Sequence, residues 1–345
     1  MTEVAPVREC DPAAVDAFLA RRPETLVYAS SRYRELLRRL LGCEEETLVA
    51  LDEHGAIRGV LPALASDGPD GRVVNSLPYY GSNGGIVAGD ALAAESLAAA
   101  WKALATAPGT LAATLVPNPF ALDSASDVSH NVEDIRISQW TPLAGDPLER
   151  AEASARRNVR KAEAAGVEVF RDPAELGRLH EIHRENMRAI GGRSKARAFF
   201  DLVPEVLRPE RDFDLWIARL EGRVVAGLLV LLFNRTVEYF TPATELAARP
   251  LQPLAAILAR SLRHYSELGF ETWNWGATWP SQESLLRFKR KWGAEERPYR
   301  YLVQLNDRAL LDRPASAILE AYEGFYVVPF AALRDAGGTS SATSL

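Results

Sequence analysis

The sequence predicts a mixed α/β (α+β) fold in which two tandem domains each contain a partly antiparallel sheet flanked by helices. The first observation behind this prediction is an internal repeat. Residues 48–61 align without a gap on residues 216–229, so that Gly59 meets Gly227. Each copy reads as an apolar strand, a polar turn and a second apolar strand that contains the glycine, which is typical of a β-hairpin. A spacing near half of the 345 residues is too long for a solenoid repeat and indicates a duplicated domain.

The second observation is that both halves of the chain repeat one order of elements. In the first half, Asp11 and Pro12 predict the start of a helix, and Gly42 predicts the end of the next one. The run Asp67–Gly71 predicts a turn, and Tyr79–Gly85 reads as an aromatic and glycine-rich loop. The expected helices are 11–20, 32–41 and 91–107, and the expected strands are the hairpin 47–64, then 73–78 and 111–116.

The second half follows the same order. Gly166 and Gly269 predict the ends of two helices, because glycine readily adopts the left-handed conformation that closes a helix. Hairpin connections pair strands antiparallel, so this order favours a mixed sheet over a doubly wound parallel one. The expected helices are 151–165, 174–189, 196–207, 254–268 and 282–292, and the expected strands are 167–170, the hairpin 215–233, then 237–241, 271–275 and 299–305.

The domain limits follow from the chain length and the repeat. At about 150 residues per domain, the chain is long enough for two domains, which we expect at 1–150 and 151–335. Residues 336–345 are small and polar, and we expect them to form a disordered tail. A cleft between two domains is the natural place for a site.

The composition is ordinary for a soluble globular chain, with 47% hydrophobic and 25% charged residues. No apolar run approaches the ~20 residues of a membrane helix, so no transmembrane segment is expected. Cys10 and Cys43 have no metal or redox spacing, and a reducing cytoplasm is the expected location. His180 and His183 lie three apart without a third ligand nearby, so we expect a solvated helix face and no metal site.

The net charge of −6 is unevenly distributed. Residues 1–150 carry 12 basic and 21 acidic side chains, whereas residues 151–345 carry 28 and 25. A negative net charge argues against non-specific nucleic-acid binding, so no DNA partner is expected. The basic bias of the second half leaves room for one localised anionic partner. The sequence also lacks a GxGxxG turn after a strand, a Walker loop and a GxSxG motif, which removes the usual signatures of nucleotide-driven and esterase chemistry.

Three stretches carry candidate chemistry. Four of the six residues in 156–161 are basic and occupy adjacent helix faces, which suits a phosphate clamp or, alternatively, a solvated cationic face. Four of the five residues in 287–291 are basic, and the aromatic residues Phe288 and Trp292 lie among and after them. This combination suits an RNA end, although the aromatic pair also suits a helix core face. Residues 76–85 combine two tyrosines with small residues, as in a ligand-lining loop or an irregular turn.

With the hairpin repeat, these stretches resemble the Fem family of aminoacyl-tRNA-dependent transferases, which is built from two GNAT-type acyltransferase domains. The resemblance runs from about Tyr28 to Leu305. Residues 157–167 read RNVRKAEAAGV, like the family's RNIRKAEKxGV. Residues 286–294 read LRFKRKWGA, like its LxxFKxxFG, and residues 76–85 resemble its SxPxxxxGG. The resemblance implies two GNAT-like domains over 1–150 and 151–335.

The resemblance implies a transferase that forms a peptide bond: an aminoacyl group passes from tRNA to a primary amine, often on a cytoplasmic peptidoglycan precursor. An aminoacyl ester is already activated, so no cofactor is expected beyond aminoacyl-tRNA as co-substrate. Catalysis then requires alignment of amine and ester and stabilisation of an oxyanion. Lys289 matches the family lysine at that step, and the Phe288 carbonyl is expected to help hold the attacking amine. The basic residues expected to meet tRNA phosphates are Arg156, Arg157, Arg160, Lys161, Arg287, Arg290 and Lys291.

The acceptor contacts of the family carry over less closely. Family members hold a phosphorylated acceptor with a basic residue in the early helix, a tyrosine near the Pro-Gly loop, and a basic–aromatic pair before the second hairpin. Phe199 departs from the tyrosine usual in that pair and lacks its hydroxyl. The best matches here are Arg38, Tyr79 or Tyr80, Lys195 with Phe199, and Tyr239.

Two alternatives remain open. The first is an acyl-CoA-dependent N-acyltransferase of the same fold, which usually cradles the CoA pyrophosphate with amides of a glycine-rich loop at a helix N-terminus. The matching stretch, residues 244–253, has no glycine and two prolines, which lack amide donors. The second alternative is a non-catalytic binding module that keeps the fold.

Overall fold

The computed structural model describes residues 2–81, 83–118, 128–329 and 332–333. They form two compact units: unit 1 contains the described residues up to Arg136 and those from Pro298 onward, and unit 2 runs from Ile137 to Arg297. The chain leaves unit 1 within strand β9 (Val132–Pro142) and returns to it within β15 (Glu295–Leu305).

The limits of these units differ from the predicted division at residue 150. The physical reason is that Leu302–Leu305 of β15 pair antiparallel with Ala112–Leu115, which draws the end of the chain into unit 1. The domain division of 1–150 and 151–335 stays a prediction, and the predicted tail at 336–345 lies outside the described residues.

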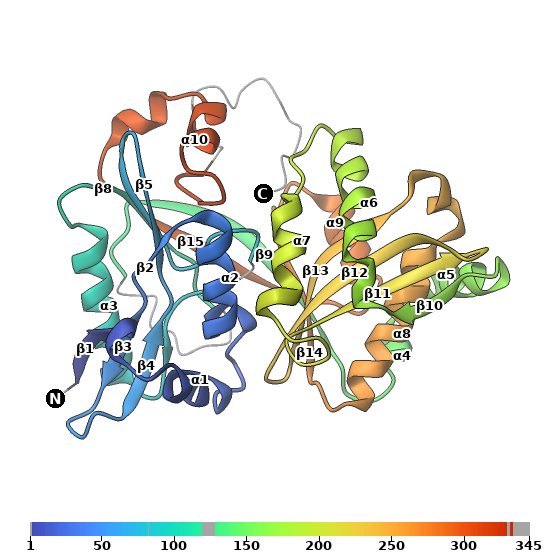
Figure 1. Ribbon diagram of the computed structural model, residues 1–345, viewed down its shortest axis with the longest axis horizontal. Helices are drawn as coiled ribbons and strands as arrows, with labels where there is room; N and C mark the ends of the chain where they lie inside the picture. Colours follow the sequence, from blue (N-terminus) through green and yellow to red (C-terminus); the bar gives the residue numbers. More distant parts are fainter. Residues whose placement is uncertain (1, 82, 119–127, 330–331, 334–345) are drawn as a thin grey trace. The chain divides into compact units, whose positions relative to one another are not determined.

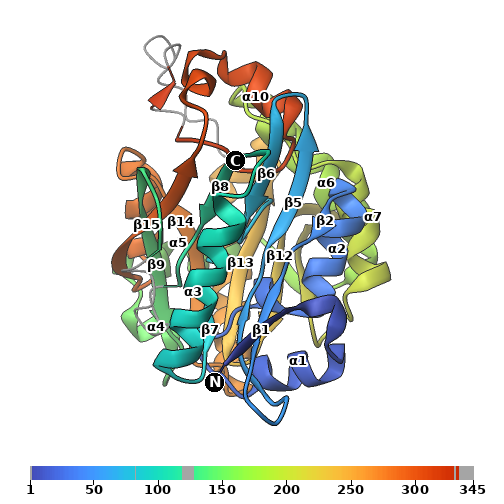
Figure 2. The same cartoon turned by 90° about the vertical axis from the view of Figure 1, so that its left-hand side faces the viewer.

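Unit 1 contains two sheets. The first has the strand order β1-β3-β4-β7, and the second contains the order β15-β8-β6-β5-β2. Helix α3 lies along the strands of the first sheet (Figure 2). Its Leu97 and Trp101 side chains are buried in the core with Ala50 and Leu61 of those strands. The elements are β1 (Glu3–Pro6), α1 (Pro12–Ala20), α2 (Ser31–Leu41), β2 (Glu44–Glu45), β3 (Leu48–Leu51), β4 (Ile57–Leu61), β5 (Leu64–Gly68), β6 (Gly71–Asn75), β7 (Val87–Ala88), α3 (Ala91–Ala105), β8 (Thr110–Leu115) and the C-terminal helix α10 (Ala315–Ala321).

Local sequence explains the helix limits of unit 1. The Asp11 side chain accepts a hydrogen bond from the Ala13 amide, so it caps α1, and Pro12 occupies the first turn, where its missing N–H costs nothing. Ser30 caps α2 in the same way, and Gly42 closes that helix with a φ of 61°.

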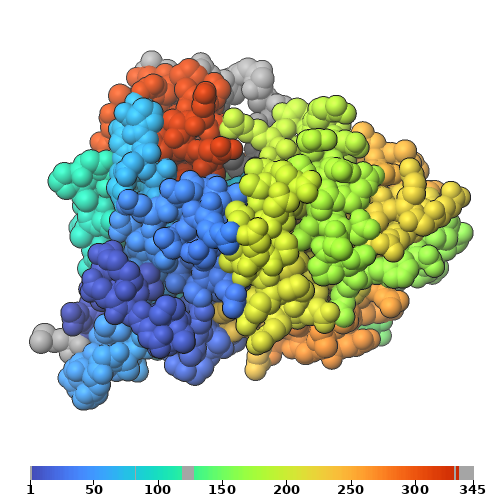
Figure 3. Space-filling model, viewed as in Figure 1, coloured from blue at the N-terminus to red at the C-terminus, as the bar shows by residue number. Residues whose placement is uncertain are grey.

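Unit 2 contains one mixed sheet in which β10, β11, β12, β13, β14 and the second part of β9 follow one another. Helices α6 and α7 cover one face of this sheet and α5 and α8 cover the other (Figure 1), and α6 and α7 lie in front of the sheet in the space-filling view (Figure 3). The elements are α4 (Pro147–Arg150), α5 (Ala153–Ala164), β10 (Glu168–Arg171), α6 (Leu176–Ala189), α7 (Arg197–Val206), β11 (Phe213–Leu220), β12 (Arg223–Phe233), β13 (Thr236–Thr244), α8 (Pro253–Glu267), β14 (Thr272–Thr278) and α9 (Glu283–Arg290).

The core of unit 2 lies between its sheet and helices α5 and α8. Trp273, Trp275 and Trp292 are all buried in it, and Phe288 packs against its edge. Trp292 is therefore a core residue, as one of the two interpretations of the 287–291 stretch predicted.

The predicted mixed α/β architecture is confirmed, and both hairpins of the repeat form. The edge strand β1 and the long strand β9, in which charged and apolar residues alternate, were not predicted from the sequence. The expected solvated face at His180 and His183 is wrong: both side chains are buried, and both imidazoles lie close to the ring of Phe200. In the described part of the chain no helix is both long and apolar enough to cross a membrane.

Candidate active site

The sheet of unit 2 opens into a fork between β13 and β14. The two strands pair in parallel only from Thr236 to Glu238 and from Thr272 to Asn274, although β13 continues to Thr244 and β14 to Thr278. Beyond the last pair, β13 stays paired only with β12 and β14 only with β9 among the described strands. A fork between parallel strands exposes backbone groups and side chains that a continuous ladder would cover, so it is a natural place for a ligand.

Two irregularities lie at the fork. In β13 the register with β12 shifts so that Phe240 is an extra residue between Tyr239 and Thr241. In β14 the register with β9 shifts between Asn274 and Ala277, and Gly276 in that bulge adopts a φ of 75°. Bulges re-aim backbone groups and side chains beside active sites.

A buried polar pair closes the base of the fork. The Asn274 amide donates to the Glu238 carboxylate at 2.7 Å, and Asn274 Oδ1 accepts from the Gly276 amide at 2.9 Å. Neither residue was predicted from the sequence, because a polar residue inside an apolar strand pattern carries no motif by itself. The available signal was a carboxylate in the otherwise apolar run of β13.

Lys289 extends from α9 to β14 just beyond the fork. Its side chain is only 2% exposed, and its Nζ donates to Thr278 Oγ1 at 2.6 Å and to the Gly276 carbonyl at 3.4 Å. Burial lowers the pKa of Lys289 from 10.5 to about 7. An ammonium has three N–H donors, and its two partners among the described residues use two of them.

The last turn of α9 also leaves a backbone acceptor near Lys289. The amides of Lys291, Trp292 and Gly293 donate to the carbonyls of Arg287, Lys289 and Arg290. Within the described residues, no backbone amide therefore reaches the Phe288 carbonyl. The Phe288 ring is half-buried and meets Trp275 edge-on, with ring centres 6.0 Å apart. This carbonyl has the chemistry expected of a group that holds an amine.

The turn between β13 and α8 differs from a phosphate-binding loop, in which free backbone amides point at the phosphates. Residues Leu246–Leu251 form a 3-10 helix, and Pro253 is the first residue of α8. The amides of Ala248 and Arg249 donate back to the Glu245 carbonyl. The Glu245 carboxylate stands at this turn, paired with Arg178 and with Arg223. A carboxylate and internally bonded amides are unfavourable for a pyrophosphate.

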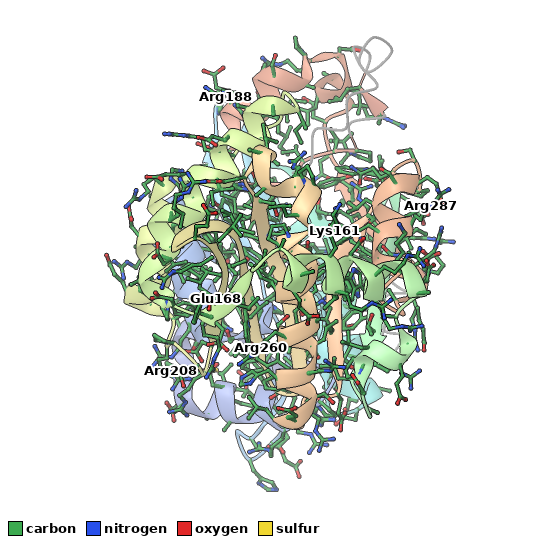
Figure 4. All side chains as sticks on the ribbon, turned by 90° about the vertical axis from the view of Figure 1, so that its right-hand side faces the viewer. Lys161, Glu168, Arg188, Arg208, Arg260 and Arg287 are labelled. Atoms are coloured by element: carbon green, nitrogen blue, oxygen red, sulfur yellow. The ribbon has the colours of Figure 1, made fainter. Side chains whose placement is uncertain are left out.

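The predicted phosphate-binding residues divide into two groups. Arg156 is already engaged, because it donates to the Ala151 and Leu148 carbonyls, and Arg290 pairs with Glu283 and Glu296, each at 2.8 Å. The others have no carboxylate within ion-pair distance among the described residues, and all but the half-buried Lys291 are exposed: Arg157, Arg160, Lys161, Arg287 and Lys291. Figure 4 shows Arg287 projecting outward from α9 and Lys161 on α5, on the same face of unit 2. The start of α5 adjoins the end of α9, since the Glu152 amide donates to the Lys291 carbonyl at 2.8 Å.

In unit 1, the structure describes the predicted acceptor residues Arg38, Tyr79 and Tyr80. Arg38 is exposed on α2 and pairs with Glu35 at 2.9 Å. Tyr79 is buried and Tyr80 is half-buried, and their rings meet edge-on with centres 4.8 Å apart. The two tyrosines therefore form one aromatic unit in the loop that follows β6.

In unit 2, Lys195 and Phe199 lie beside the same ring. Lys195 is buried, its Nζ is 5.1 Å from the centre of the Phe240 ring, and burial lowers the pKa of Lys195 to about 7. Phe199 is fully buried with its ring centre 5.6 Å from that of Phe240. The structure adds His183, whose Nε2 accepts the Lys195 amide at 3.2 Å. Burial and the nearby Lys195 lower the pKa of His183 to about 3, so the imidazole is neutral.

Tyr239, the last predicted acceptor residue, lies at the bulge of β13. Its half-buried ring packs against Trp275, with ring centres 5.0 Å apart, and burial raises the pKa of Tyr239 above its usual value. Tyr239 thus lies on one strand of the fork, β13, and the Lys289 side chain reaches the other, β14, from α9. None of the predicted roles is tested by these positions, so they stay predictions.

Comparisons with known proteins agree with this architecture. The model of the acetyltransferase (GNAT) domain family matches residues 149–290. Among solved structures, FemX superposes with a TM-score of 0.72 at 16% identity, covering 89% of this chain and 98% of FemX. L-PGS from Bacillus licheniformis gives 0.54 at 14% identity and covers 90% and 95%, and a tandem GNAT protein from the clavulanic acid biosynthesis pathway gives 0.51 at 15% and covers 88% and 97%. No curated protein sequence matches the chain significantly.

These likenesses confirm the predicted double GNAT-type fold. The sequence identities are low, so they concern the fold alone. The GNAT match over unit 2 agrees with the prediction of an acyltransferase and includes the fork and Lys289.

Proposed function

We propose that this protein is an N-acyltransferase that moves an aminoacyl group from aminoacyl-tRNA to a primary amine and forms an amide bond. The acceptor class proposed is the peptide of a peptidoglycan precursor or of a secondary metabolite. No bound cofactor is required, because the ester of aminoacyl-tRNA is already activated. The likeness to FemX, a double GNAT-type fold, supports the choice of reaction class.

The observation that carries the choice of donor is the turn between β13 and α8. CoA-dependent relatives need amide donors at this turn, but here Pro250 and Pro253 lack them and Glu245 adds a negative charge. By contrast, unit 2 presents exposed cations on α5 and α9 that the protein does not neutralise among its described residues. Such cations are suited to the phosphates of an acceptor arm.

The proposed chemistry places the bond change at the fork. The amine attacks the ester carbonyl, the new C–N bond forms, and the tRNA ribose oxygen leaves with a proton while the amine loses one. Lys289, as the ammonium, donates its remaining N–H to the oxyanion of the tetrahedral intermediate. The Phe288 carbonyl accepts an N–H of the attacking amine and fixes its direction. A pKa of about 7 lets Lys289 also pass a proton at neutral pH.

The test uses the full chain, a mixed pool of charged tRNA and a panel of peptides with free amines, followed by mass spectrometry of the acceptors. We expect an aminoacyl mass shift with charged tRNA and none with acetyl-CoA. Lys289→Met removes one oxyanion donor and is expected to lower the rate about 10²- to 10³-fold. Arg263→Ala, which removes only a surface ion pair with Asp146, is the matched control and is expected to keep full activity.

Transfer from acetyl-CoA instead of charged tRNA would support the CoA-dependent alternative. If cells that carry Lys289→Met behave like cells that carry the wild-type protein, the protein would act as a binding module without catalysis. Full acyl transfer by that variant would remove Lys289 from the mechanism.

A further inference from the structure

The segment after β15 folds back over unit 1 and contacts β6 and β8. The Asn75 side chain makes two hydrogen bonds to the backbone of Tyr326 in this segment. Asn75 Nδ2 donates to the Tyr326 carbonyl at 2.8 Å, and the Tyr326 amide donates to Asn75 Oδ1 at 2.7 Å. Thr114 adds a hydrogen bond to the same carbonyl at 3.2 Å, and the Tyr322 hydroxyl donates to the Gly71 carbonyl at 3.0 Å. We call residues 315–329 the strap, and Figure 3 shows its red surface against the β5–β6 hairpin.

Asn75 is the last residue of β6, so the strap is anchored where the Tyr79–Tyr80 loop begins. That loop holds an unusual backbone. Tyr79 has a φ of 60° and Tyr80 a φ of 57°. L-residues with large side chains rarely adopt left-handed values, and two in succession persist only where the surroundings impose them.

The strap supplies part of that constraint at Gly324. The Tyr79 amide donates to the Gly324 carbonyl at 2.7 Å, while the Tyr33 hydroxyl donates to the Tyr79 carbonyl at 3.3 Å. The backbone of Tyr79 is therefore fixed on both sides of its Cα atom, from the strap and from α2.

Gly324 also allows the strap to approach closely. Its φ is 80°, and a Cβ atom there would lie 2.8 Å from Leu41 Cδ2 and 3.3 Å from the Tyr79 ring. Glycine is the residue that meets both requirements, since it has no Cβ atom and tolerates positive φ. The backbone of the strap at Gly324 therefore lies beside the Tyr79 ring as well as bonding to the Tyr79 amide.

We propose that the strap pre-organises the Tyr79–Tyr80 pair for the acceptor, with Gly324 and Asn75 as positioning residues. This inference rests on the proposed function and on the predicted role of these two tyrosines as acceptor contacts. A loop already ordered in its binding conformation loses less conformational entropy when the ligand arrives. Without the strap, the two tyrosines relax to ordinary φ values and their edge-on pair is lost.

Hydrogen–deuterium exchange of the full chain tests the strap without reference to activity. Gly324→Ala is expected to raise exchange in residues 77–81, and Asn75→Ala is expected to do the same if the glycine variant folds poorly. Tyr322→Phe is the matched control: it removes a strap hydrogen bond to Gly71, away from the tyrosine loop, and is expected to leave that exchange unchanged.

Kinetics with a synthetic peptide whose lysine side chain supplies the amine then test the role in binding. Gly324→Ala and Asn75→Ala are both expected to raise KM for the peptide about tenfold, with kcat and KM for charged tRNA within about twofold of the wild type. Unchanged exchange in residues 77–81, or raised exchange with an unchanged peptide KM, would overturn the proposal. Raised exchange in a protein that transfers nothing to any amine would support the strap and contradict the proposed function.

Discussion

The hairpin β3–β4 of unit 1 and the hairpin β11–β12 of unit 2 share a frame in spite of their different surroundings. In both, the register shifts immediately after the alanine that the repeat aligns, Ala50 in one copy and Ala218 in the other. Both alanines also face a valine of an antiparallel edge strand, Val4 of β1 and Val169 of β10. A shared bulge at equivalent positions is a structural feature that a chance similarity of apolar patterns does not explain.

The two copies differ in the strands that come after the hairpin. In unit 1, β4 pairs with the two-residue strand β7, and β8 lies in another sheet. In unit 2, β12 pairs with the long β13, which joins β14 for three residues before the fork. The difference teaches that duplication supplied the frame, whereas the candidate chemistry lies in the elements that the copies do not share.

The largest expected effect concerns buried charge. Both buried lysines of the described residues, Lys195 and Lys289, belong to unit 2. Between pH 7 and 10.5 the unfolded chain binds a proton at Lys289 that the folded chain does not, so folding stability rises with pH across that window. At pH 7 the desolvated charge costs about 4 kcal/mol, offset in part by the hydrogen bond to Thr278.

We therefore expect Lys289→Met to be more stable than the wild type at pH 7, with a gap that closes as the pH approaches 10. Urea denaturation at a series of pH values measures it, and Lys195 contributes equally to both proteins. Lys102→Met, at an exposed lysine of unit 1, is the matched control and is expected to show no such trend. If the difference in free energy of unfolding between Lys289→Met and the wild type stays constant with pH, Lys289 does not carry the buried charge that distinguishes unit 2 from unit 1.

The next effect compares the aligned glycines of the two hairpins. A Cβ at Gly59 would lie 2.8 Å from Leu97 Cδ1 and 3.3 Å from the Val87 carbonyl, whereas one at Gly227 would lie 3.0 Å from Leu179 Cδ1 and meet no backbone atom closer than 3.5 Å. A side chain can shift more easily than a backbone carbonyl, so Gly59→Ala is expected to lower the free energy of unfolding by about 1–3 kcal/mol and Gly227→Ala by less than about 1.

Chemical denaturation of the two variants checks this order. The intrinsic preference of a strand for alanine over glycine acts equally at both sites and cancels in the difference. Equal losses would mean that the two hairpins pack against their helices in the same way.

The sequence predicted the elements that have strong periodicity and clear end signals, such as α2 between Ser30 and Gly42. Strand β9 was missed, because its first half alternates charged residues in a pattern that also suits a solvated loop. The lysine at 289 was predicted from a resemblance, but its burial was not, since lysine is almost always exposed. The left-handed pair Tyr79–Tyr80 had no sequence signal, because such φ values are normally assigned to glycine or asparagine.

The return of β15 to unit 1 was equally invisible in the sequence. An apolar strand pattern predicts a strand but not its partner, and the pairing of Leu302 with Leu115 joins positions far apart in the chain. The candidate site was therefore predictable as a set of residues, whereas its arrangement depended on long-range pairing.

The smallest expected effect sharpens the charge contrast between the halves. Arg157 and Arg160 are exposed on α5 and have no carboxylate partner among the described residues, while Arg263 on α8 pairs with Asp146 at 2.9 Å. Each arginine that meets a phosphate contributes about 1 to the slope of log affinity against log salt, so alanine at 157 or 160 is expected to weaken tRNA binding a few-fold and reduce that slope by about 1. Fluorescence anisotropy with labelled tRNA at about 50 and about 200 mM salt measures both quantities, and Arg263→Ala is expected to change neither. An identical slope in all three variants and the wild type would mean that the cations of α5 do not meet phosphate, and the basic bias of the second half would then reflect internal ion pairing alone.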